Sequence, residues 1–536
     1  MIREDCVHRT GFPFPDGGVI PEWQEVQTLA EGRGKGMDMG GGQKEDSRYD
    51  EYTAILAENP VYRHAFEGAC AEYLRRNGKQ MPLDSRLYLM VFAPSLIGFV
   101  NWVMEQAAAA GKDRLYFLSR DGYQMYLIGR QLSAYRNLPV ECRYLHVSRY
   151  SMRIPGYHLN MEKCIDSICV GGIDVTPLKI LRRGALTEEE CRLVIKELHL
   201  EAIQNKVLNF RQVTGLKERL AASGSLKKYI RKHSLAAYDK AIGYLKQEGL
   251  CKDSRFAIAD SGWVGTLQCS IEGLVQSVNS EIEVEGYYFG MYELPEGAKR
   301  ERFHPYYFSA FHGRARKSRF SNSLFETIVS AEEGMTLAYG EESGKYVPIV
   351  LKRGNPNGGQ LRRNVEALEL FLHQLETECG SPCGQDGKTE NGFGKKTEDN
   401  GAKFAERLLG KFMSEPTALE YDCYGKDFFS DDVFDDCQRE AAAKLTWEQI
   451  KDQRLLSKLL IISGIKKAVI HESAWLEGSA FGAAYRQDTF GASEPERRLR
   501  AEWRHIRRYK SFIYLRKQLK AFRRLLTAKQ TVQKPF

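Results

Sequence analysis

The amino-acid sequence predicts an α/β fold: a Rossmann-like, mainly parallel sheet with a helical insertion and a helical C-terminal region. The first observation is that three short apolar segments each end at small and charged residues: 115–118, 144–147 and 256–259. Apolar segments of this length, bounded by turn residues, are typical of buried strands. The second observation is that helical patterns separate the segments, and strand–helix–strand units favour parallel pairing.

The order of these patterns predicts how the chain is organised. Two Gly-rich segments, one at the start and one after residue 378, cannot bury much apolar surface, so neither joins a folded core. We therefore expect a flexible leader over 1–50, a Rossmann-like domain over 51–350 with a helical insertion at about 160–250, a helix over 351–378, a linker over 379–402 and a helical region over 403–536.

The spacing of apolar residues predicts the individual elements. The first two strands flank a helix over 123–132, which completes one strand–helix–strand unit. Within the insertion, apolar residues at three- and four-residue intervals predict helices at 186–198, 200–210 and 225–248. After the third strand we expect a helix at 266–278, a strand at 282–292 and a helix at 324–330.

The stretch from Leu87 to Met104 contains no charged residue and is 18 residues long, which is the short limit for a membrane span. It is interrupted by Pro94, Gly98 and Asn101. We interpret it as a buried core helix, with a transmembrane helix as the alternative. The first 50 residues lack the apolar segment of a secretory signal, so we expect a cytoplasmic protein.

Charge is distributed unevenly along the chain. The 536 residues carry a formal net charge of +8, but residues 497–536 alone carry +13, which leaves −5 for the remainder. This tail also places apolar residues at near-helical intervals, as a basic amphipathic helix does. We expect it either to make a peripheral membrane contact or to pack on the body of the protein. Nucleic acid is the less favoured partner, because no nucleic-acid-binding motif accompanies the tail.

Neither the cysteines nor the acidic segment Asp431–Asp436 predicts a metal site. The 12 cysteines are scattered, and the closest pairs, Cys164 with Cys169 and Cys379 with Cys383, lack the paired spacing of zinc knuckles. We expect free thiols in a reducing compartment. No apolar strand precedes the acidic segment, so we interpret it as a solvated loop.

The first strand is followed by Ser119, Arg120, Asp121 and Gly122. A strand that turns into a helix here directs backbone N–H groups at an anion, and Arg120 adds a bidentate contact to phosphate. Asp121 repels such an anion unless a cation lies between them. The alternative is an ordinary turn in which Asp121 caps the helix.

The second strand ends at another Ser-Arg pair, Ser148 and Arg149. Ligands of open α/β sheets bind outside the carboxyl ends of the strands, so neighbouring strands would bring Arg120 and Arg149 into one crevice. Alternatively, each arginine is an ordinary solvated surface group. Together the two pairs predict an anionic, phosphorylated ligand.

The third strand leads into the most specific local pattern, which combines a carboxylate, hydroxyls and two glycines: Asp260, Ser261, Gly262, Trp263, Gly265 and Thr266. Loops of this kind cradle phosphate. We expect Asp260 to hold Mg²⁺ or to act as a base, and Trp263 to stack on a sugar ring or a base. The alternative is a glycine turn with Trp263 packed in the core.

These motifs resemble those of a bacterial protein family. The segments 117–122, 147–149 and 260–268 are similar to predicted hydrolases of the haloacid-dehalogenase-like superfamily that are linked to surface-polysaccharide gene clusters, as are 93–99 and 325–334. The resemblance covers roughly residues 87–340. It implies a protein that acts on a phosphorylated sugar or a nucleotide sugar, by hydrolysis or group transfer, in surface-polysaccharide biosynthesis.

The chain departs from that family in one respect. The longer members carry an N-terminal phosphatase-like module whose nucleophilic aspartate lies in the pattern Phe-Asp-Thr-Leu, and nothing before Leu87 matches it. The aspartyl-phosphate mechanism therefore does not carry over. We expect Arg120 and Arg149 to hold the phosphate, and Asp260 with Asp121 to position Mg²⁺ or move a proton. The alternative is a catalytically inactive scaffold that binds a phosphorylated ligand and recruits partners at the membrane surface.

Overall fold

The computed structural model describes residues 42–136, 138–170, 175–379, 398–429, 439–463, 465–486 and 494–532. The chain divides into two units, residues 1–44 and 45–536, and the elements below belong to the second unit, apart from the first residues of α2 (Gly42–Ala57). Most of the expected leader, the interior of the expected linker and the acidic segment Asp431–Asp436 lie outside the described residues.

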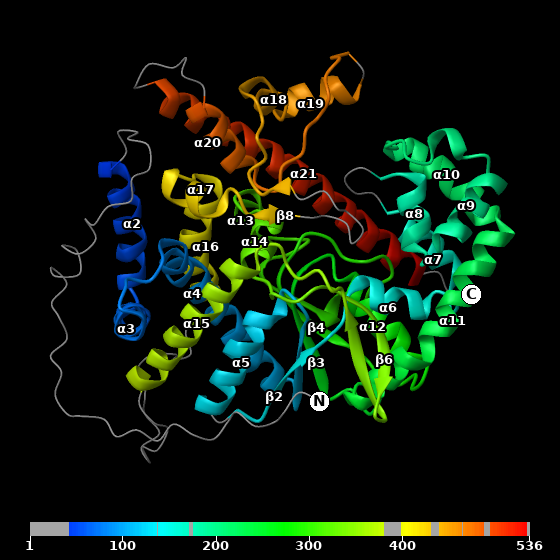
Figure 1. The fold of residues 1–536 in the computed structure, drawn as a ribbon, viewed down its shortest axis with the longest axis horizontal. Helices are drawn as coiled ribbons and strands as arrows, with labels where there is room; N and C mark the ends of the chain where they lie inside the picture. Colours follow the sequence, from blue (N-terminus) through cyan, green and yellow to red (C-terminus); the bar gives the residue numbers. More distant parts are fainter. Residues whose placement is uncertain are drawn as a thin grey trace. The chain divides into compact units, whose positions relative to one another are not determined.

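Five parallel strands form the central sheet (Figure 1). In spatial order they are β2 (Glu141–Leu145), β1 (Arg114–Leu118), β3 (Phe256–Trp263), β4 (Glu285–Met291) and β5 (Phe303–Phe308). This is one of the two common orders of doubly wound sheets, and it confirms the α/β, Rossmann-like fold class. The chain runs from β1 to β2 on one side and then places β3 on the other side of β1, so the strand order reverses between β1 and β3.

The strands are stabilised by burial of apolar residues on both faces of the sheet. In β1, Leu115 and Phe117 belong to the core on one face of the sheet, whereas Tyr116 and Leu118 belong to the core on the other face, as the two-residue period of a strand requires. Strand β1 pairs in register with both β2 and β3. The three carboxyl ends therefore meet at one edge of the sheet.

Helices cover both faces of the sheet. On one face the core includes α4 (Leu83–Ala109) and α5 (Gly122–Arg136), with further helices packed around them: α3 (Pro60–Asn77), α15 (Gly358–Cys379) and α16 (Glu398–Ser414). On the other face the core includes α6 (Arg149–Gly156), α11 (Gly224–Gln247), α12 (Thr266–Gln276) and the hairpin of β6 (Thr336–Glu342) and β7 (Lys345–Val350). Two short helices, α13 (Arg314–Ser318) and α14 (Asn322–Ile328), follow β5, and the 3₁₀ turn η3 (Arg300–Arg302) precedes it.

Helix α4 contains the uncharged stretch that also satisfied the length criterion for a membrane span. Of the helices in the described part of the chain, it is the one long and apolar enough to cross a membrane, and 89% of its most apolar window is buried inside the protein. Ser95 Oγ donates to Val91 O at 2.7 Å within the helix, next to Pro94. The interpretation of this stretch as a buried core helix is therefore confirmed.

The segment between β2 and β3 also carries α7 (Met161–Ile168), α8 (Pro177–Arg183), α9 (Glu188–Glu197) and α10 (Phe210–Ala222) (Figure 1, teal to green), which form a further apolar core together with residues of α6 and α11. The expected helix over 200–210 is wrong, because this stretch contains only the short 3₁₀ helix η2 (Glu201–Ile203). Asn209 instead caps the start of α10, where its Oδ1 accepts from Gln212 N at 3.0 Å. An N-cap residue has extended backbone, which ends one element and begins another.

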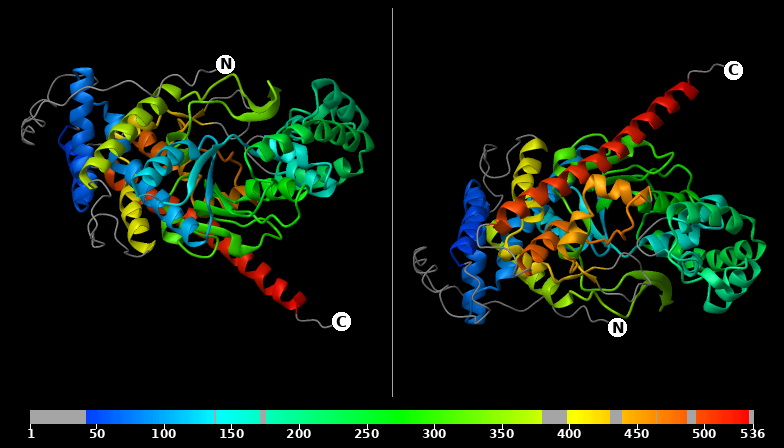
Figure 2. Two further views of the ribbon diagram at one scale, coloured as in Figure 1. Left: turned by 90° about the horizontal axis from the view of Figure 1, so that it is seen from below. Right: turned by 90° about the horizontal axis from the view of Figure 1, so that it is seen from above.

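The described part of the C-terminal region beyond α16 contains these elements: α17 (Ala418–Tyr424), β8 (Phe428–Phe429), β9 (Arg439–Glu440), α18 (Trp447–Lys451), α19 (Leu455–Ile462), α20 (Leu476–Arg486) and α21 (Glu494–Val532). Helix α21 is 39 residues long (Figure 2, red). Its first half packs on α20, burying Leu499, Trp503 and Ile506. At least this half of the basic tail is a packing helix, which is one of the two functions expected for it.

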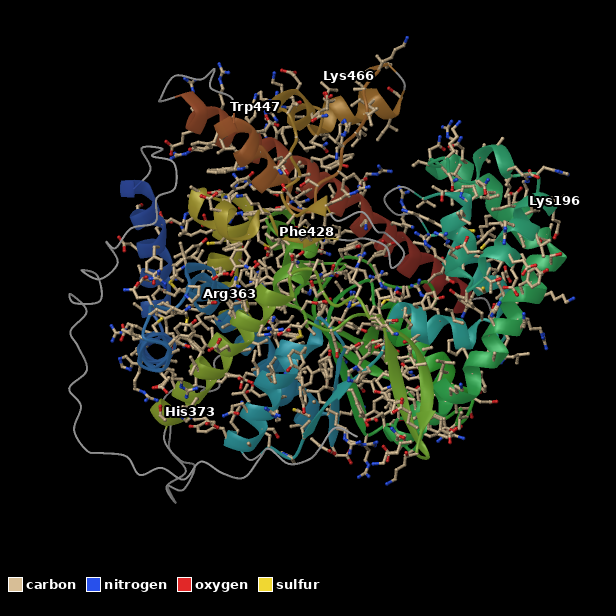
Figure 3. All side chains as sticks on the ribbon, in the orientation of Figure 1. Lys196, Arg363, His373, Phe428, Trp447 and Lys466 are labelled. Atoms are coloured by element: carbon tan, nitrogen blue, oxygen red, sulfur yellow. The ribbon has the colours of Figure 1, made fainter. Side chains whose placement is uncertain are left out.

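Buried polar contacts fasten the C-terminal region to the helices of the α/β domain. Tyr424 Oη in α17 donates to Asp84 O at the start of α4 at 2.6 Å. Arg363 of α15 (Figure 3) donates to the carboxylate of the same Asp84. Tyr52 Oη donates to Glu420 Oε1 at 2.6 Å. These contacts join α17, α15 and α4 into one layer.

Candidate functional site

The residues that follow β1 and β3 meet at the point where the strand order reverses. Ser261 Oγ, in β3, donates a hydrogen bond of 2.7 Å to Asp121 Oδ2, in the turn after β1. The two residues lie 140 positions apart in the sequence. Open α/β sheets bind their ligands in the crevice at such a reversal, so this edge is the candidate site.

Three carboxylates gather at the edge: Asp121 after β1, Asp260 in β3 and Glu326 in α14. Burial and, after it, the charge of Asp121 raise the pKa of Asp260 to about 7. The same two causes raise the pKa of Glu326 to about 8, and burial raises the pKa of Asp121. Carboxylates with such pKa values exchange protons near neutral pH, as general acids and bases must.

Two exposed arginines lie beside these carboxylates. The charges of Arg120 and Arg149 both act on Asp121, where they lower its pKa against the effect of burial. The charge of Arg149 also acts on Asp260. The arginine side chains are exposed to solvent, so their guanidinium groups are accessible to an anion that approaches the edge. The charge of Arg149 therefore acts on both aspartates, and that of Arg120 acts on Asp121. These interactions agree with the expectation that Arg120, Arg149 and Asp260 lie at one edge of the sheet.

The backbone at Arg120 is held in an unusual conformation. Its φ of 70° lies in the left-handed region, which is uncommon for a residue other than glycine. The Arg120 N–H donates to Tyr144 Oη at 2.9 Å, and Tyr144 Oη donates to Glu333 Oε1 at 2.6 Å. Tyr144 therefore links the turn after β1 to the segment after α14. Such strain is retained where surrounding contacts fix it.

The hydroxyls of Ser119 and Ser148 are engaged by the protein itself. Ser119 Oγ donates to Val147 O at 2.6 Å and accepts from Val147 N at 3.1 Å, which joins the ends of β1 and β2. Ser148 caps α6 by accepting from Ser151 N at 2.9 Å, and it donates to Thr336 O at 2.6 Å. Both residues were expected to bind substrate. Their hydroxyls instead bond to the protein backbone, and these contacts fix the chain next to Arg120 and Arg149.

The end of β3 and the loop after it depend on their glycines. Gly262 has a φ of 106°, and a Cβ there would lie 2.5 Å from Gly290 O in β4. Gly265 has a φ of 78°, and its Cβ would lie 2.7 Å from the Phe303 ring. Gly122, in the turn after β1, is similarly close to Phe117, with 3.0 Å between a Cβ and the backbone carbonyl carbon. The glycines were expected to let a ligand approach, and here they let the chain approach itself.

Trp263 and Thr266 also contact the protein rather than open space. Trp263 is buried against Phe308, Phe320 and Phe325, and its Nε1 donates to Glu326 Oε1 at 2.5 Å. This is the core-packing alternative for Trp263, and it leaves no ring face for a sugar. Thr266 begins α12, and its Oγ1 accepts from Arg153 Nη2 at 3.0 Å.

Sequence reasoning missed two residues of the edge, Glu326 and Arg153. Glu326 is half-buried in α14, between the buried residues Phe325 and Thr327. An acidic residue within such an apolar segment is a signal that the sequence offered. Arg153 lies on α6, one turn after Arg149. Burial and the charge of Arg149 lower its pKa, against the effect of Tyr157. No pattern in the sequence distinguishes Arg153 from a surface arginine.

The oxygen donors at this edge are of the kind that Mg²⁺ prefers. Among the described residues, however, no group of three or more His, Cys, Asp and Glu side chains is placed to hold a metal ion by itself. The cysteines supply no alternative, since burial raises the pKa of Cys164 to about 12 and that of Cys169 to about 11 and thereby disfavours the thiolate that binds metals.

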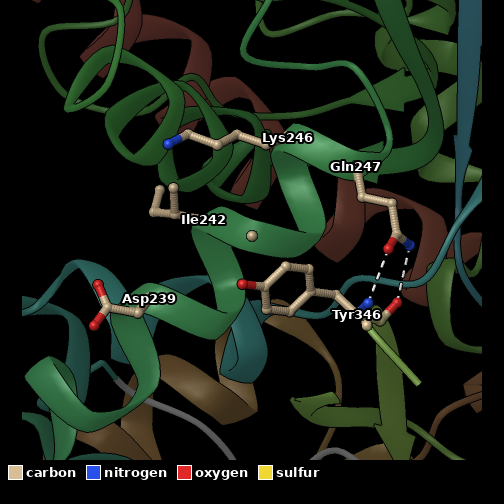
Figure 4. A pocket seen from close by; sticks show the side chains of 7 residues that line it. Asp239, Ile242, Lys246, Gln247 and Tyr346 are labelled. Carbon is tan, nitrogen blue, oxygen red and sulfur yellow. Dashed lines mark hydrogen bonds between the residues drawn. The ribbon is translucent and has the colours of Figure 1, made fainter. Parts of the chain in front are cut away.

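A cavity of about 530 Å³ lies away from this edge, between α11 and the β6–β7 hairpin (Figure 4). Gln247 Nε2 donates to Tyr346 O at 2.9 Å, and Tyr346 N donates to Gln247 Oε1 at 2.8 Å. The Tyr346 ring lies against Gly243, where a Cβ would be 2.2 Å from it. These are contacts that dock the hairpin on the helix, and they point to packing rather than to ligand binding.

Comparison with models of known protein families finds none that matches the chain, and comparison with curated proteins also finds no match.

Proposed function

We propose that the chain is an enzyme that binds a phosphorylated sugar or a nucleotide sugar at the carboxyl edge of its sheet and catalyses hydrolysis or group transfer at the phosphate, in the cytoplasm, during surface-polysaccharide biosynthesis. The observation that carries this proposal is the hydrogen bond between Ser261 and Asp121 at the strand-order reversal, which brings acidic and basic groups from β1 and β3 together. The resemblance of 117–122 and 260–268 to haloacid-dehalogenase-like proteins supports the substrate class.

The proposed division of labour follows from charge and exposure. Arg120 and Arg149 are exposed guanidinium groups, each of which can donate hydrogen bonds to two phosphate oxygens. Asp260, with a pKa raised to about 7 by burial and by Asp121, can take a proton from an attacking group or give one to a leaving group at neutral pH. Asp121 is held by Ser261 and therefore keeps its orientation.

A magnesium ion fits the donor set of this edge. As the alternative to proton transfer by Asp260, Asp121 and Asp260 would hold the ion through ionised carboxylate oxygens, since Mg²⁺ is commonly bound by one or two carboxylates together with substrate phosphate oxygens. When bound, the ion would neutralise charge that develops on the phosphate. It would also reduce the repulsion between the two carboxylates and the anion. Without a cation, Asp121 alone would repel a phosphate at this edge.

The test is a ligand screen followed by a turnover assay. The full chain is examined by thermal shift with sugar phosphates and nucleotide sugars, with and without Mg²⁺, and product formation is followed for each ligand that raises Tm. Asp260→Asn should retain binding and lose turnover by about 10²-fold or more, while Asp239→Asn, an exposed aspartate of α11, should behave as wild type. Equal turnover in Asp260→Asn would refute the assigned role of this carboxylate.

A specific surface favours a second candidate, the non-catalytic scaffold at a membrane. Four apolar residues on and after α19 are 69 to 74% exposed: Leu456, Ile462, Ile465 and Val469. Lys466 and Lys467 lie among them (Figure 3 shows Lys466). Exposed apolar side chains flanked by lysines are typical of segments that bind anionic membrane surfaces. Ligand binding without turnover under every tested condition would favour this scaffold over the enzyme.

A further inference from the structure

A second cavity, of about 400 Å³, lies between α13 and α14 on one side and the C-terminal helices α19 to α21 on the other. Four lysines line it: Lys317, Lys458, Lys510 and Lys517. They come from three separate elements, α13, α19 and α21. Lys510 and Lys517 lie two turns apart on one face of α21, because seven residues complete about two helical turns. Cavities of this size accommodate small-molecule ligands.

The lysines are not fully balanced by carboxylates. Lys510 Nζ donates to both oxygens of Glu477 at 2.7 and 2.8 Å, and Lys517 Nζ lies 3.4 Å from Glu293 Oε2. The charge of Glu472 acts on Lys458. Within the described part of the chain, no carboxylate forms a direct ion pair with Lys317, although the charge of Glu477 acts on it. Lys317 Nζ donates to Asn322 Oδ1 at 2.8 Å, which is a neutral acceptor.

Aromatic rings hold these ammonium groups around the cavity. Lys517 Nζ lies 3.8 Å from the centre of the Tyr292 ring, and Lys317 Nζ lies 5.5 Å from the same ring. Lys458 Nζ lies 4.0 Å from the centre of the Tyr509 ring. Cation–π contacts orient a lysine but do not neutralise its charge, so the ammonium groups remain available to an anion.

Burial and the repulsion between the lysines lower the pKa values of Lys317 and Lys458. Burial and then the charges of Lys510 and Lys517 lower the pKa of Lys317 to about 7. Burial also lowers the pKa of Lys458 to about 8, where the charge of Glu472 opposes it and that of Lys510 adds to it. An anion in the cavity would favour the charged form of each lysine and remove their repulsion.

We infer that this cavity is a second anion-binding site, which takes a phosphate group carried by a soluble phosphate ester or by a phospholipid headgroup. The Lys317 amine, which a bound anion would hold in its charged form, and the two-turn spacing of Lys510 and Lys517 provide the phosphate contacts. Ser323 adds a hydroxyl to the wall, whereas the Ser321 hydroxyl donates to Ala474 O at 2.6 Å. The site does not depend on the proposed function. The Phe320 ring in its wall packs on Trp263, with 5.5 Å between ring centres, so an aromatic layer stands between the cavity and Glu326.

Binding to the full chain is measured by calorimetry with pyrophosphate as the soluble probe. Lys317→Met and Lys517→Met should weaken binding about tenfold or more, because each removes a charge-assisted hydrogen bond. Arg508→Met is the matched control, since Arg508 is an exposed basic residue of the same helix and lies outside the cavity. Arg149→Ala, at the sheet edge, should leave this binding unchanged. Loss of binding in Arg149→Ala alone would overturn the inference.

The lipid source is tested by co-sedimentation with phosphatidylcholine vesicles that contain or lack phosphatidic acid. Sedimentation that requires both phosphatidic acid and Lys317, with weak pyrophosphate binding, identifies a headgroup as the occupant. Binding of pyrophosphate without such sedimentation identifies a soluble ester. If neither probe binds in a manner that depends on Lys317 and Lys517, the cavity is not an anion site.

A labelling experiment covers the case in which a substituted chain does not fold. Wild-type protein is treated with an amine-reactive reagent at pH 7.5, and modification is located by mass spectrometry. Pyrophosphate, or vesicles containing phosphatidic acid, should protect Lys317 and Lys458 several-fold while leaving Lys520 equally reactive. Identical labelling of Lys317 with and without both probes contradicts the inference.

Discussion

In the folded protein, ionisation of the Asp260 and Glu326 carboxyl groups is less favourable than in the unfolded chain. Their pKa values are raised from 3.8 and 4.5 to about 7 and about 8, mainly by burial and then by the charge of Asp121. The folded state therefore binds these protons more tightly than the unfolded state. By linkage, the contribution of these two groups to the free energy of unfolding falls as pH rises from about 4 to about 8, and is constant above that range.

Glu326→Gln should remove part of this pH dependence. The amide keeps an oxygen that accepts from Trp263 Nε1 but carries no charge, so the variant should gain about 2 °C in Tm at pH 8.5 and match the wild type at pH 6. Tm is measured across pH in the presence of EDTA, so that bound metal does not contribute. Parallel Tm curves for the two proteins would show that Glu326 does not titrate in this range.

Arg149→Ala separates ligand binding from stability. Arg149 is exposed, so its removal should change the free energy of unfolding by less than about 0.5 kcal/mol. The affinity for a phosphorylated ligand identified in the screen should fall about tenfold or more. Arg192→Ala in α9, an exposed arginine of the insertion, should change neither quantity. Equal affinity in both variants would place the phosphate elsewhere.

The end of β3 and the loop after it set the shape of the sheet edge. Their residues change from strand to helix over a few positions, and the backbone takes positive φ at Gly262, Trp263 and Gly265. The two glycines lie against β4 and Phe303, so this segment and β4 are fitted to each other. Any side chain at these glycines must displace a neighbouring strand or ring.

Gly262→Ala should therefore destabilise the protein by about 2–3 kcal/mol, since it combines a strained φ with a close contact to Gly290 O. Gly273→Ala in α12 is the matched control. No atom outside its own helix lies within 4 Å of a Cβ there, and alanine in a helix should stabilise by about 0.5–1 kcal/mol. Urea denaturation measures both. A neutral Gly262→Ala would mean that β4 moves aside readily.

The strands and the sheet edge were predictable from the sequence, whereas several side-chain partners were not. Apolar segments that end at turn residues marked the carboxyl ends of β1, β2 and β3, because burial of a strand on both faces leaves an uninterrupted apolar pattern. Sequence reasoning could not find Arg153, whose place depends on how α6 packs. It expected Trp263 to face a ligand, whereas a φ of 81° directs the chain so that the ring packs on Phe308.

Helix boundaries inside the insertion show a related limit. The expected helix over 200–210 rested on apolar spacing alone, and that spacing continues through residues that form a turn. The capping interaction of Asn209 with Gln212 decides where α10 begins. A cap outweighs periodicity because it satisfies backbone N–H groups that the first turn otherwise leaves unpaired.

At the scale of the whole molecule, the strongly exposed apolar residues on and after α19 are a feature that burial within the described part of the chain does not account for. Ile462→Asp combined with Ile465→Asp should leave Tm unchanged within about 2 °C, because both side chains are 74% exposed. The same variant should lose partition onto anionic vesicles by about tenfold. Leu193→Asp, an exposed leucine of the insertion, is the control. Undiminished partition in the double variant would assign membrane contact to another surface.

The hydrogen bond from Ser261 to Asp121 closes a loop of the chain that contains helices α7 to α10. These helices form a further apolar core together with residues of α6 and α11, while β1 and β3 are held side by side by their own ladder. Length changes inside the insertion therefore need not alter the geometry of the edge. A longer, shorter or different segment at this place would leave the sheet as it is, so a different recognition surface could stand above an unchanged edge.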